Sequence, residues 1–187
     1  MQAYEKGRQL LDELSVRLAE TRGGQVEFAA MHPGDQVPMY GCSMAAVRVS
    51  AMWPTRSFPI PIDGANSRPG EKLSWVVQYE MVVDRCYGNT EKNEMPALDQ
   101  LDSLQRDAMD DFRAMQRAAQ CAFTRGSVLL GQWLPRGPMG GMHGGTMTVT
   151  VAADLHCDCD VEIPQFDAQH PPLPNDPRFP GSMRKRR

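Results

Sequence analysis

The sequence predicts an α+β domain in which two helices pack on a mostly antiparallel sheet. Two long segments carry apolar residues at helical spacing, and several shorter ones alternate apolar with polar residues, as half-buried strands do. Their order along the chain is α-β-β-β-α-β-β, and runs of strands separated by single helices are typical of α+β domains rather than of parallel nucleotide-binding sheets. We place this domain at residues 1–153 and expect residues 154–187 to form an extended, proline-rich C-terminal tail.

The N-terminal part of the domain is predicted to be a helix followed by two strands. The helix is expected over residues 3–22, because Gly23-Gly24 is typical of a helix end. The strands are expected at residues 26–30 and 41–53, and a proline-containing loop with Phe58-Pro59 follows. The apolar face of the helix is predicted to consist of Tyr4, Leu11, Leu14 and Leu18, and the apolar side of the second strand of Ala45, Val47, Val49 and Ala51.

The central part combines the clearest strand pattern with the clearest helical one. The strand covers residues 73–86 and places an apolar side chain at every odd position from Leu73 to Val83. After a polar linker, Pro96 suits the first turn of a helix that ends near Phe123. The helix carries an apolar stripe at steps of three or four, which predicts lengthwise packing on the sheet: Leu101, Leu104, Ala108, Phe112, Met115, Ala119 and Ala122.

Two closing strands, at residues 128–134 and 146–153, enclose a bend rich in glycine and methionine. A phosphate-binding loop needs a strand before it and a helix after it, but strand-forming threonines and valines follow these glycines. We therefore interpret residues 138–145 as a flexible connection between strands, and as a docking loop for a partner. Its interface candidates are Pro138, Gly140, Gly141, His143 and Gly144.

Length, charge and cysteine content bound the class of protein. The 187 residues suffice for one domain with a buried core, and a net charge of −3 with a pI of about 5.8 is no global nucleic-acid signature, although residues 184–187 form a basic run. No apolar run approaches the roughly 18 residues of a membrane span, and the charged N-terminus lacks the apolar core of a signal peptide. We expect function in a reducing cytoplasm, without a membrane partner, and with Cys42, Cys86 and Cys121 as small buried hydrophobes.

One segment gathers metal-ligand side chains, namely His156, Cys157 and Cys159. A single residue separates the two thiols and no second CxxC or HxxxH pair complements them, so a strand end with exposed thiols is the alternative to a zinc site. No motif supplies the oriented base or activated thiol of nucleophilic catalysis, and His32 and His143 fall in glycine- and proline-rich turns where we expect solvated imidazoles. The sequence thus predicts neither an enzyme nor a cofactor.

The polar face of the second helix is the main candidate interaction surface. It carries the acidic residues Asp107, Asp110 and Asp111 beside the basic residues Arg106, Arg113 and Arg117. A solvated, salt-bridged face is one explanation, and contact with a neighbouring subunit is the other, because alternating charges can set the register of an interface. We retain as interface candidates Asp110, Asp111, Arg113 and Arg117. The three tryptophans are expected to be core or rim anchors: Trp53, Trp75 and Trp133.

Residues 3–153 contain three sequence features in a characteristic order. One is the N-terminal helix and following strand with the Phe58-Pro59 loop. Another is a long strand ending in Arg85-Cys86, followed by a polar linker and a helix with the acidic pair Asp110-Asp111. The last is a Trp-x-Pro-x-Gly-Pro-x-Gly-Gly-x-x-Gly segment, residues 133–144, that leads into a strand. In this combination the chain resembles the tail terminator proteins of long-tailed (siphovirus-type) bacteriophages, especially the divergent versions in phages of actinobacteria.

The resemblance implies a virion protein, assembled in the host cytoplasm, that forms a homohexameric ring. Such a ring caps the major tail tube protein, stops tube elongation and meets the head completion protein, while DNA passes through its lumen without sequence-specific binding. The C-terminal tail is outside the resemblance, but a tail that orders on a neighbour would staple a ring. The alternatives are a head–tail stopper or connector of the phage neck and, from a different class, a small metal-binding regulatory protein that uses His156, Cys157 and Cys159.

Overall fold

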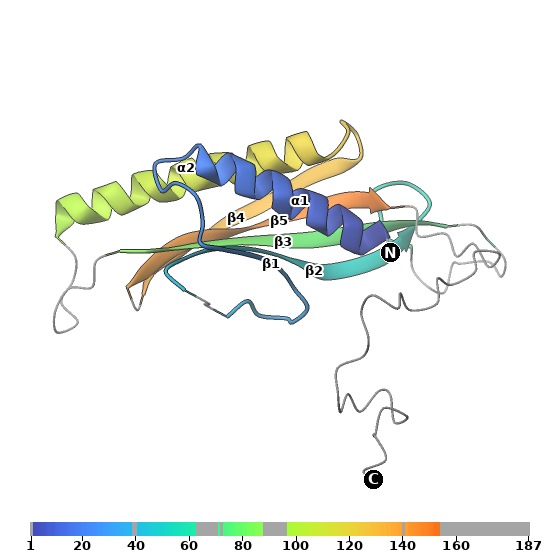
Figure 1. The fold of residues 1–187 in the computed structure, drawn as a ribbon. Coiled ribbons are helices and arrows are strands. Elements are labelled where there is room, and N and C mark those ends of the chain that lie inside the picture. Colours follow the sequence, from blue (N-terminus) through green and yellow to red (C-terminus); the bar gives the residue numbers. More distant parts are fainter. Residues whose placement is uncertain are drawn as a thin grey trace, which may run out of the picture. The chain divides into compact units, whose positions relative to one another are not determined.

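The computed structural model describes residues 2–38, 41–62, 71, 73–87, 97–139 and 141–153. The chain divides into two units, Met1–Leu155 and His156–Arg187, and the described residues all belong to the first. Its elements are α1 (Gln2–Ala19), β1 (Phe28–His32), β2 (Ser43–Thr55), β3 (Ser74–Cys86), α2 (Leu98–Ala122), β4 (Val128–Met139) and β5 (Met142–Ala153). The predicted α+β class and element order are confirmed, and both helices cover the same face of the sheet (Figure 1).

The five strands form one sheet in the order β1-β2-β3-β5-β4, so that β3 is central and β1 and β4 are its edges. Strands β2, β3, β5 and β4 pair antiparallel to their neighbours, whereas β1 pairs parallel to β2. The short first strand was predicted two residues too early, at 26–30. It is parallel to β2 because the segment between them returns the chain to the same end of the sheet before β2 begins.

The core lies between the helices and the inward side of the sheet. The alternation predicted for β3 is confirmed, because Val77, Tyr79, Met81 and Val83 are fully buried against the helices. The predicted helix face needs one correction: Tyr4 is 61% exposed, and Leu10 lies in the core with Leu11, Leu14 and Leu18. The buried hydroxyl of Tyr79 donates to the carbonyl oxygen of Ala3 at 2.6 Å, which anchors the first turn of α1.

A smaller apolar cluster lies on the opposite face of the sheet. Val37, from the segment between β1 and β2, packs with Met44, Ala46 and Val82. This cluster explains why Val82 is apolar although it occupies an outward position of β3. The sheet therefore buries apolar side chains on both faces near β2 and β3.

Helix α2 has the predicted bounds at its C-terminal end and much of the predicted stripe. Ala108, Met115, Ala119 and Ala122 are buried, while Leu101, Leu104 and Phe112 are partly buried. The ring of Phe112 lies 5.5 Å from that of Trp133 on β4, which joins the helix to the edge strand. All three tryptophans are partly buried, as core or rim anchors are. The predicted helix-starting Pro96 lies outside the described residues.

Within the described parts of the chain, neither helix combines the length and apolarity needed to cross a membrane.

The glycine-rich bend, predicted as a loop over residues 138–145, is mostly strand, and its predicted docking role stays a prediction. Strands β4 and β5 continue to its tip, so that only two residues separate them, and Gly141 takes a left-handed conformation with φ of +81°. Gly144 lies inside β5, where a Cβ atom would overlap the carbonyl oxygen of Val83. It pairs in register with both Asp84 and Arg136, whose side chains form an ion pair at 2.9 Å. Glycine is thus required in the strand for close approach, rather than for loop mobility.

The cysteines also differ from the prediction. Cys42 and Cys86 are both exposed and form a disulfide, with their Cα atoms 4.8 Å apart. The backbone amide of Cys86 donates to the carbonyl oxygen of Cys42 at 2.6 Å, next to the paired ends of β2 and β3. Cys121 on α2 is an exposed free thiol. None of the three is the small buried hydrophobe that the sequence predicted.

Candidate functional site

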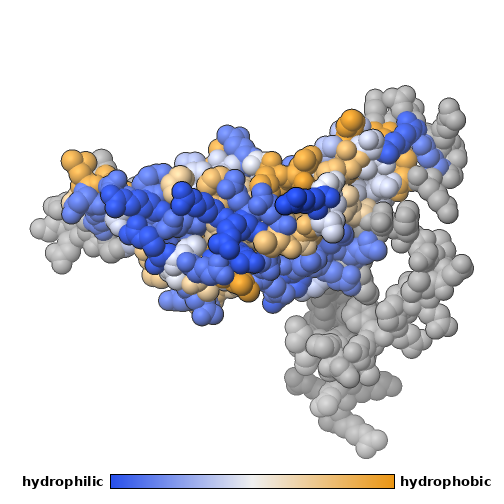
Figure 2. Space-filling view, turned by 90° about the horizontal axis from the view of Figure 1, so that it is seen from above, coloured by the Kyte–Doolittle hydropathy of each residue, from blue (hydrophilic) through white to orange (hydrophobic). Residues whose placement is uncertain are grey.

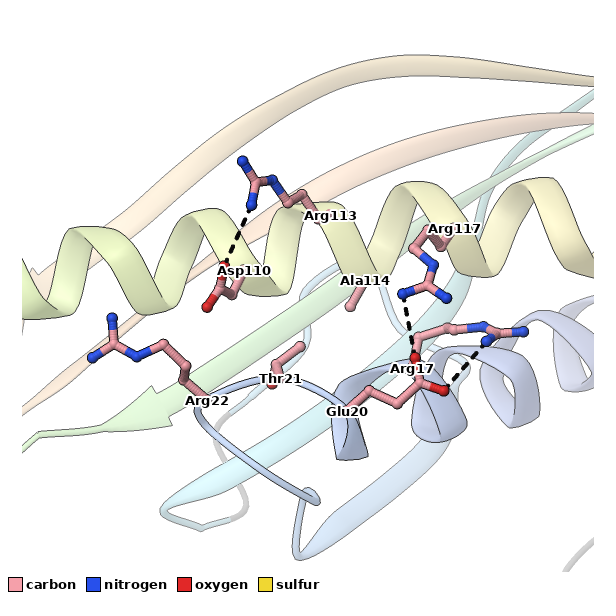
Figure 3. A pocket seen from close by; sticks show the side chains of 8 residues that line it. All are labelled: Arg17, Glu20, Thr21, Arg22, Asp110, Arg113, Ala114 and Arg117. Carbon is pink, nitrogen blue, oxygen red and sulfur yellow. Dashed lines mark hydrogen bonds and ion pairs between the residues drawn. The ribbon is translucent and has the colours of Figure 1, made fainter.

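A groove lined by arginines lies between the C-terminal end of α1 and the middle of α2 (Figure 3). Its volume is about 200 Å³. One wall comes from α1 and the turn after it, and the other from α2. The lining consists of Arg17, Glu20, Thr21 and Arg22 on the first wall and Asp110, Arg113, Ala114 and Arg117 on the second. We call these eight residues the arginine groove.

Ion pairs within and around the arginine groove differ in strength. Arg17 is held firmly, because its Nε and Nη2 both donate to Oε1 of Glu13, at 2.8 and 2.5 Å, and this hydrogen bonding raises the pKa of Arg17. Glu20 is shared: its carboxylate lies 3.4 Å from Arg17 and 3.3 Å from Arg117. Arg113 approaches Asp110 only to 3.9 Å. Arg17 is thus held by short hydrogen bonds to Glu13, whereas the other arginines of the groove make longer ion pairs.

Three guanidinium groups of the groove remain open to solvent. The side chains of Arg22, Arg113 and Arg117 are 51%, 76% and 58% exposed. Arg22 contacts Asp107 outside the lining, at 3.5 Å. Exposed ion pairs at such distances contribute little stability, generally below about 1 kcal/mol. Its lining carries four guanidinium groups and two carboxylates, and Glu13 and Asp107 next to the lining supply the carboxylate partners of Arg17 and Arg22. The groove is therefore a surface of exposed, mostly long ion pairs that can exchange partners with polar groups of another molecule.

The structure brings three of the predicted interface residues together here: Asp110, Arg113 and Arg117. It adds Arg17, Glu20 and Arg22, which the sequence analysis missed because they lie about 90 positions earlier in the chain. The charged residues at the end of the first predicted helix could have indicated a polar surface there. Nothing in the sequence, however, shows that this helix end lies beside the middle of α2. Figure 2 shows that the outer side of the helical layer, which contains the groove, is mostly hydrophilic.

Asp111 is not part of this exposed face, contrary to the prediction. It is 3% exposed and lies below the groove, where both its oxygens accept hydrogen bonds from Arg85: Nη2 to Oδ1 at 2.9 Å and Nε to Oδ2 at 3.0 Å. Arg85 also donates to the carbonyl oxygens of Gly23 and Gly24, at 2.9 and 2.8 Å. This buried clamp joins β3, α2 and the turn after α1, and so holds the two walls of the groove together.

His143 is buried as well, whereas the sequence predicted a solvated imidazole. It is 6% exposed, and its Nδ1 atom has no hydrogen-bond partner. It lines a separate cavity of about 190 Å³ between the first half of α2 and the tip of the β4–β5 hairpin, together with Leu101, Leu104 and Gly144. Burial lowers the pKa of His143; nearby Asp107 and Asp111 oppose this effect and Arg85 adds to it. His143 and Gly144 thus belong to the packing of the hairpin and not to the arginine groove.

The burial of His143 predicts that acid destabilises the protein. Its folded-state pKa lies below the ordinary value of 6.5, so the unfolded chain binds more protons around that pH. The stabilisation is complete above pH 6.5 and is lost progressively as the pH falls from 6.5 through the lower folded-state pKa. Urea unfolding should therefore show a lower free energy of unfolding at pH 5.5 than at pH 7.5, by up to about 1.4 kcal/mol per pH unit. His143→Gln should flatten this slope; an unchanged slope would contradict the assignment.

The remaining predicted site residues lie outside the described residues, or have undescribed side chains. Gly140, His156, Cys157, Cys159 and the basic run 184–187 belong to the first group, and Pro138, whose backbone is part of β4, belongs to the second. Within the described residues, no group of three or more His, Cys, Asp or Glu side chains could hold a metal ion. No protein-family model matches this chain, and no curated protein matches it.

Proposed function

We propose that this chain is a structural virion protein of a long-tailed phage, a tail terminator whose subunits form a hexameric ring. The ring caps the tail tube, stops its elongation and joins it to the head completion protein, with DNA passing through the lumen. The observation that carries the proposal is the arginine groove: three exposed, loosely paired guanidinium groups on a wall of two packed helices. Arginine is enriched in protein interfaces, where its planar group binds carboxylates in two-point contacts.

A closed ring needs two different contact patches on every subunit. The arginine groove on the helical layer is one. The edge strand β4 is a candidate for the other, because Leu129 and Leu134 on it are 45% and 50% exposed. Both point to the face of the sheet opposite the helices, since they pair with Thr150 and Thr146. The two patches therefore lie on different sides of the subunit, as head-to-tail contacts require.

Further support comes from the sequence pattern that resembles tail terminators. Its three segments map onto α1, β2 and the Phe58-Pro59 turn, onto β3 and α2, and onto the β4–β5 hairpin. These segments contain every helix and strand of the folded unit except β1.

The proposal is tested by the mass of the assembled protein and by its effect on tubes. Light scattering after size exclusion, and negative-stain images of the peak, should show rings of six copies. Purified rings added to polymerising tail tube protein should shorten the tubes and label one end of each. A strict monomer that leaves tube length unchanged would refute the proposal.

A further inference from the structure

We propose that the cavity between the first half of α2 and the tip of the β4–β5 hairpin binds a phenol, whose hydroxyl group bonds to the imidazole of His143. This inference goes beyond the proposed function and does not depend on ring formation. It rests on the apolar walls of the cavity, on its volume and on a buried imidazole whose Nδ1 atom lacks a partner. The phenol is a small molecule or the tyrosine side chain of another protein, and competition experiments separate these two sources.

The cavity is accessible from one side and buried on the other. Pro135 and Gly137, on the strand β4, are exposed, whereas Ala108 on α2 and His143 on β5 are each 6% exposed. A ligand that enters beside β4 therefore meets the imidazole at the buried side of the cavity.

The walls favour an uncharged ligand. Arg136 also lines the cavity, but its charge is already paired, because its Nη1 atom donates to Oδ2 of the buried Asp84 at 2.9 Å. Binding sites for small molecules typically combine such apolar walls with a few polar groups that orient the ligand. The apolar side chains of the lining are Leu101, Leu104, Ala108 and Pro135.

The volume of the cavity matches an aromatic ring with one small polar substituent. It is about 190 Å³. An apolar protein cavity of about 150 Å³ binds benzene, and a water molecule occupies about 30 Å³ of liquid. A benzene ring and a hydroxyl group together therefore have the size that this cavity holds.

The imidazole of His143 explains why the substituent is a hydroxyl group. Its Nδ1 atom has no hydrogen-bond partner among the described residues. A buried polar atom without a partner is costly, so a ligand that bonds to it is favoured. Burial, the main cause of the lowered pKa of His143, favours the neutral imidazole, in which one nitrogen donates and the other accepts. A hydroxyl group can both donate and accept, and so it completes Nδ1 in either tautomer.

Fluorine NMR of the ligands tests the site on the full-length protein in its native assembly state. The resonance of 4-fluorophenol should broaden when protein is added. Its dissociation constant should be about tenfold lower than that of fluorobenzene, because only the phenol can form the hydrogen bond to His143. Ala108→Leu, which fills the cavity from α2, should abolish binding of both ligands.

His143→Phe tests the role of the imidazole. The variant keeps an aromatic ring at the buried side of the cavity but removes both nitrogens. It should lose the preference for 4-fluorophenol and still bind fluorobenzene, which a misfolded chain cannot do. His32→Phe is the matched control on β1, at the opposite edge of the sheet from β4, where Nδ1 of His32 accepts from the backbone amide of Gly34 at 3.0 Å. It should leave both affinities unchanged.

Competition identifies the source of the phenol. Displacement of 4-fluorophenol by N-acetyltyrosinamide, but not by N-acetylphenylalaninamide, would support the tyrosine side chain of another protein. Displacement by p-cresol alone would support a small phenol.

Three results would overturn the inference. Equal affinities of the native chain for 4-fluorophenol and fluorobenzene would leave Nδ1 of His143 to a water molecule. An undiminished preference for 4-fluorophenol in His143→Phe would remove the imidazole from the site, and unchanged binding in Ala108→Leu would place the ligand elsewhere. None of the three bears on the proposed function, which is tested by ring formation and tube length.

Discussion

Replacement of Asp111 by alanine should lower the free energy of unfolding by about 3–5 kcal/mol, the usual cost of breaking a buried ion pair. The substitution leaves the guanidinium group of Arg85 buried, 4% exposed, without its carboxylate. Taking two charges out of water is costly, and their attraction and hydrogen bonds compensate only while both are present. The loss is therefore much larger than for any surface pair of this protein.

The neighbouring aspartate provides the matched control. Asp110→Ala removes a carboxylate one position away, but its side chain is 30% exposed and lies 3.9 Å from Arg113. We expect a change below about 1 kcal/mol. Chemical denaturation of both variants at neutral pH makes the comparison. Equal effects of the two substitutions would mean that the clamp does not hold the helices to the sheet.

The same clamp should affect assembly through the groove above it. Because Arg85 and Asp111 join the turn after α1 to α2, loss of the pair should also loosen the walls that carry Arg22 and Arg117. Asp111→Ala is thus expected to lower self-association as well as stability, whereas Asp110→Ala should spare the fold.

Removal of the Cys42–Cys86 disulfide is expected to cost about 2–4 kcal/mol. The bond closes a loop with a sequence separation of 44 residues, and the chain-entropy relation gives about 4 kcal/mol for such a loop at 25 °C. The double variant Cys42→Ser and Cys86→Ser should unfold at lower urea concentration than the native chain in oxidising buffer. Both positions are exposed, so serine should introduce no packing defect.

Reductant provides the internal check on the disulfide. Dithiothreitol should bring the native chain to the stability of the double serine variant and should leave that variant unchanged. Cys121→Ser, at the exposed free thiol, should behave like the native chain in both buffers. Identical unfolding midpoints of the native chain and the double variant without reductant would contradict the stabilising role.

Periodic segments could be predicted well because their signal is local. The odd-position alternation of β3 and the stripe of α2 depend only on which side chains must avoid water on a strand or a helix. The same patterns contained the buried clamp: Arg85 continues the inward positions of β3, and Asp111 lies three residues after Ala108 and four before Met115. A charge at an inward position of each element is a signal for a buried pair, but the charged neighbours of Asp111 on α2 favour a solvated face when the sequence is considered alone.

The glycine bend shows the opposite case. The sequence predicts that Gly144 belongs to a flexible loop, because glycine is frequent in turns. In the fold Gly144 lies in β5, where it makes room for the carbonyl group of Val83 and for the Asp84–Arg136 ion pair that spans it. His143 was likewise expected in solvent because of its glycine neighbours, and it became buried because the hairpin continues as paired strands to its tip.

The sequence by itself determined the class of the fold, the order of its elements and the inward faces of the long strand and of the second helix. Only the tertiary structure decided which buried charges pair with each other, which cysteines meet and which arginines share a groove. The reason is the distance along the chain: Arg85 and Asp111 are 26 residues apart, Cys42 and Cys86 are 44 apart, and Thr21 and Asp111 are 90 apart. Contacts of that separation depend on the register and packing of whole elements, which no local pattern contains.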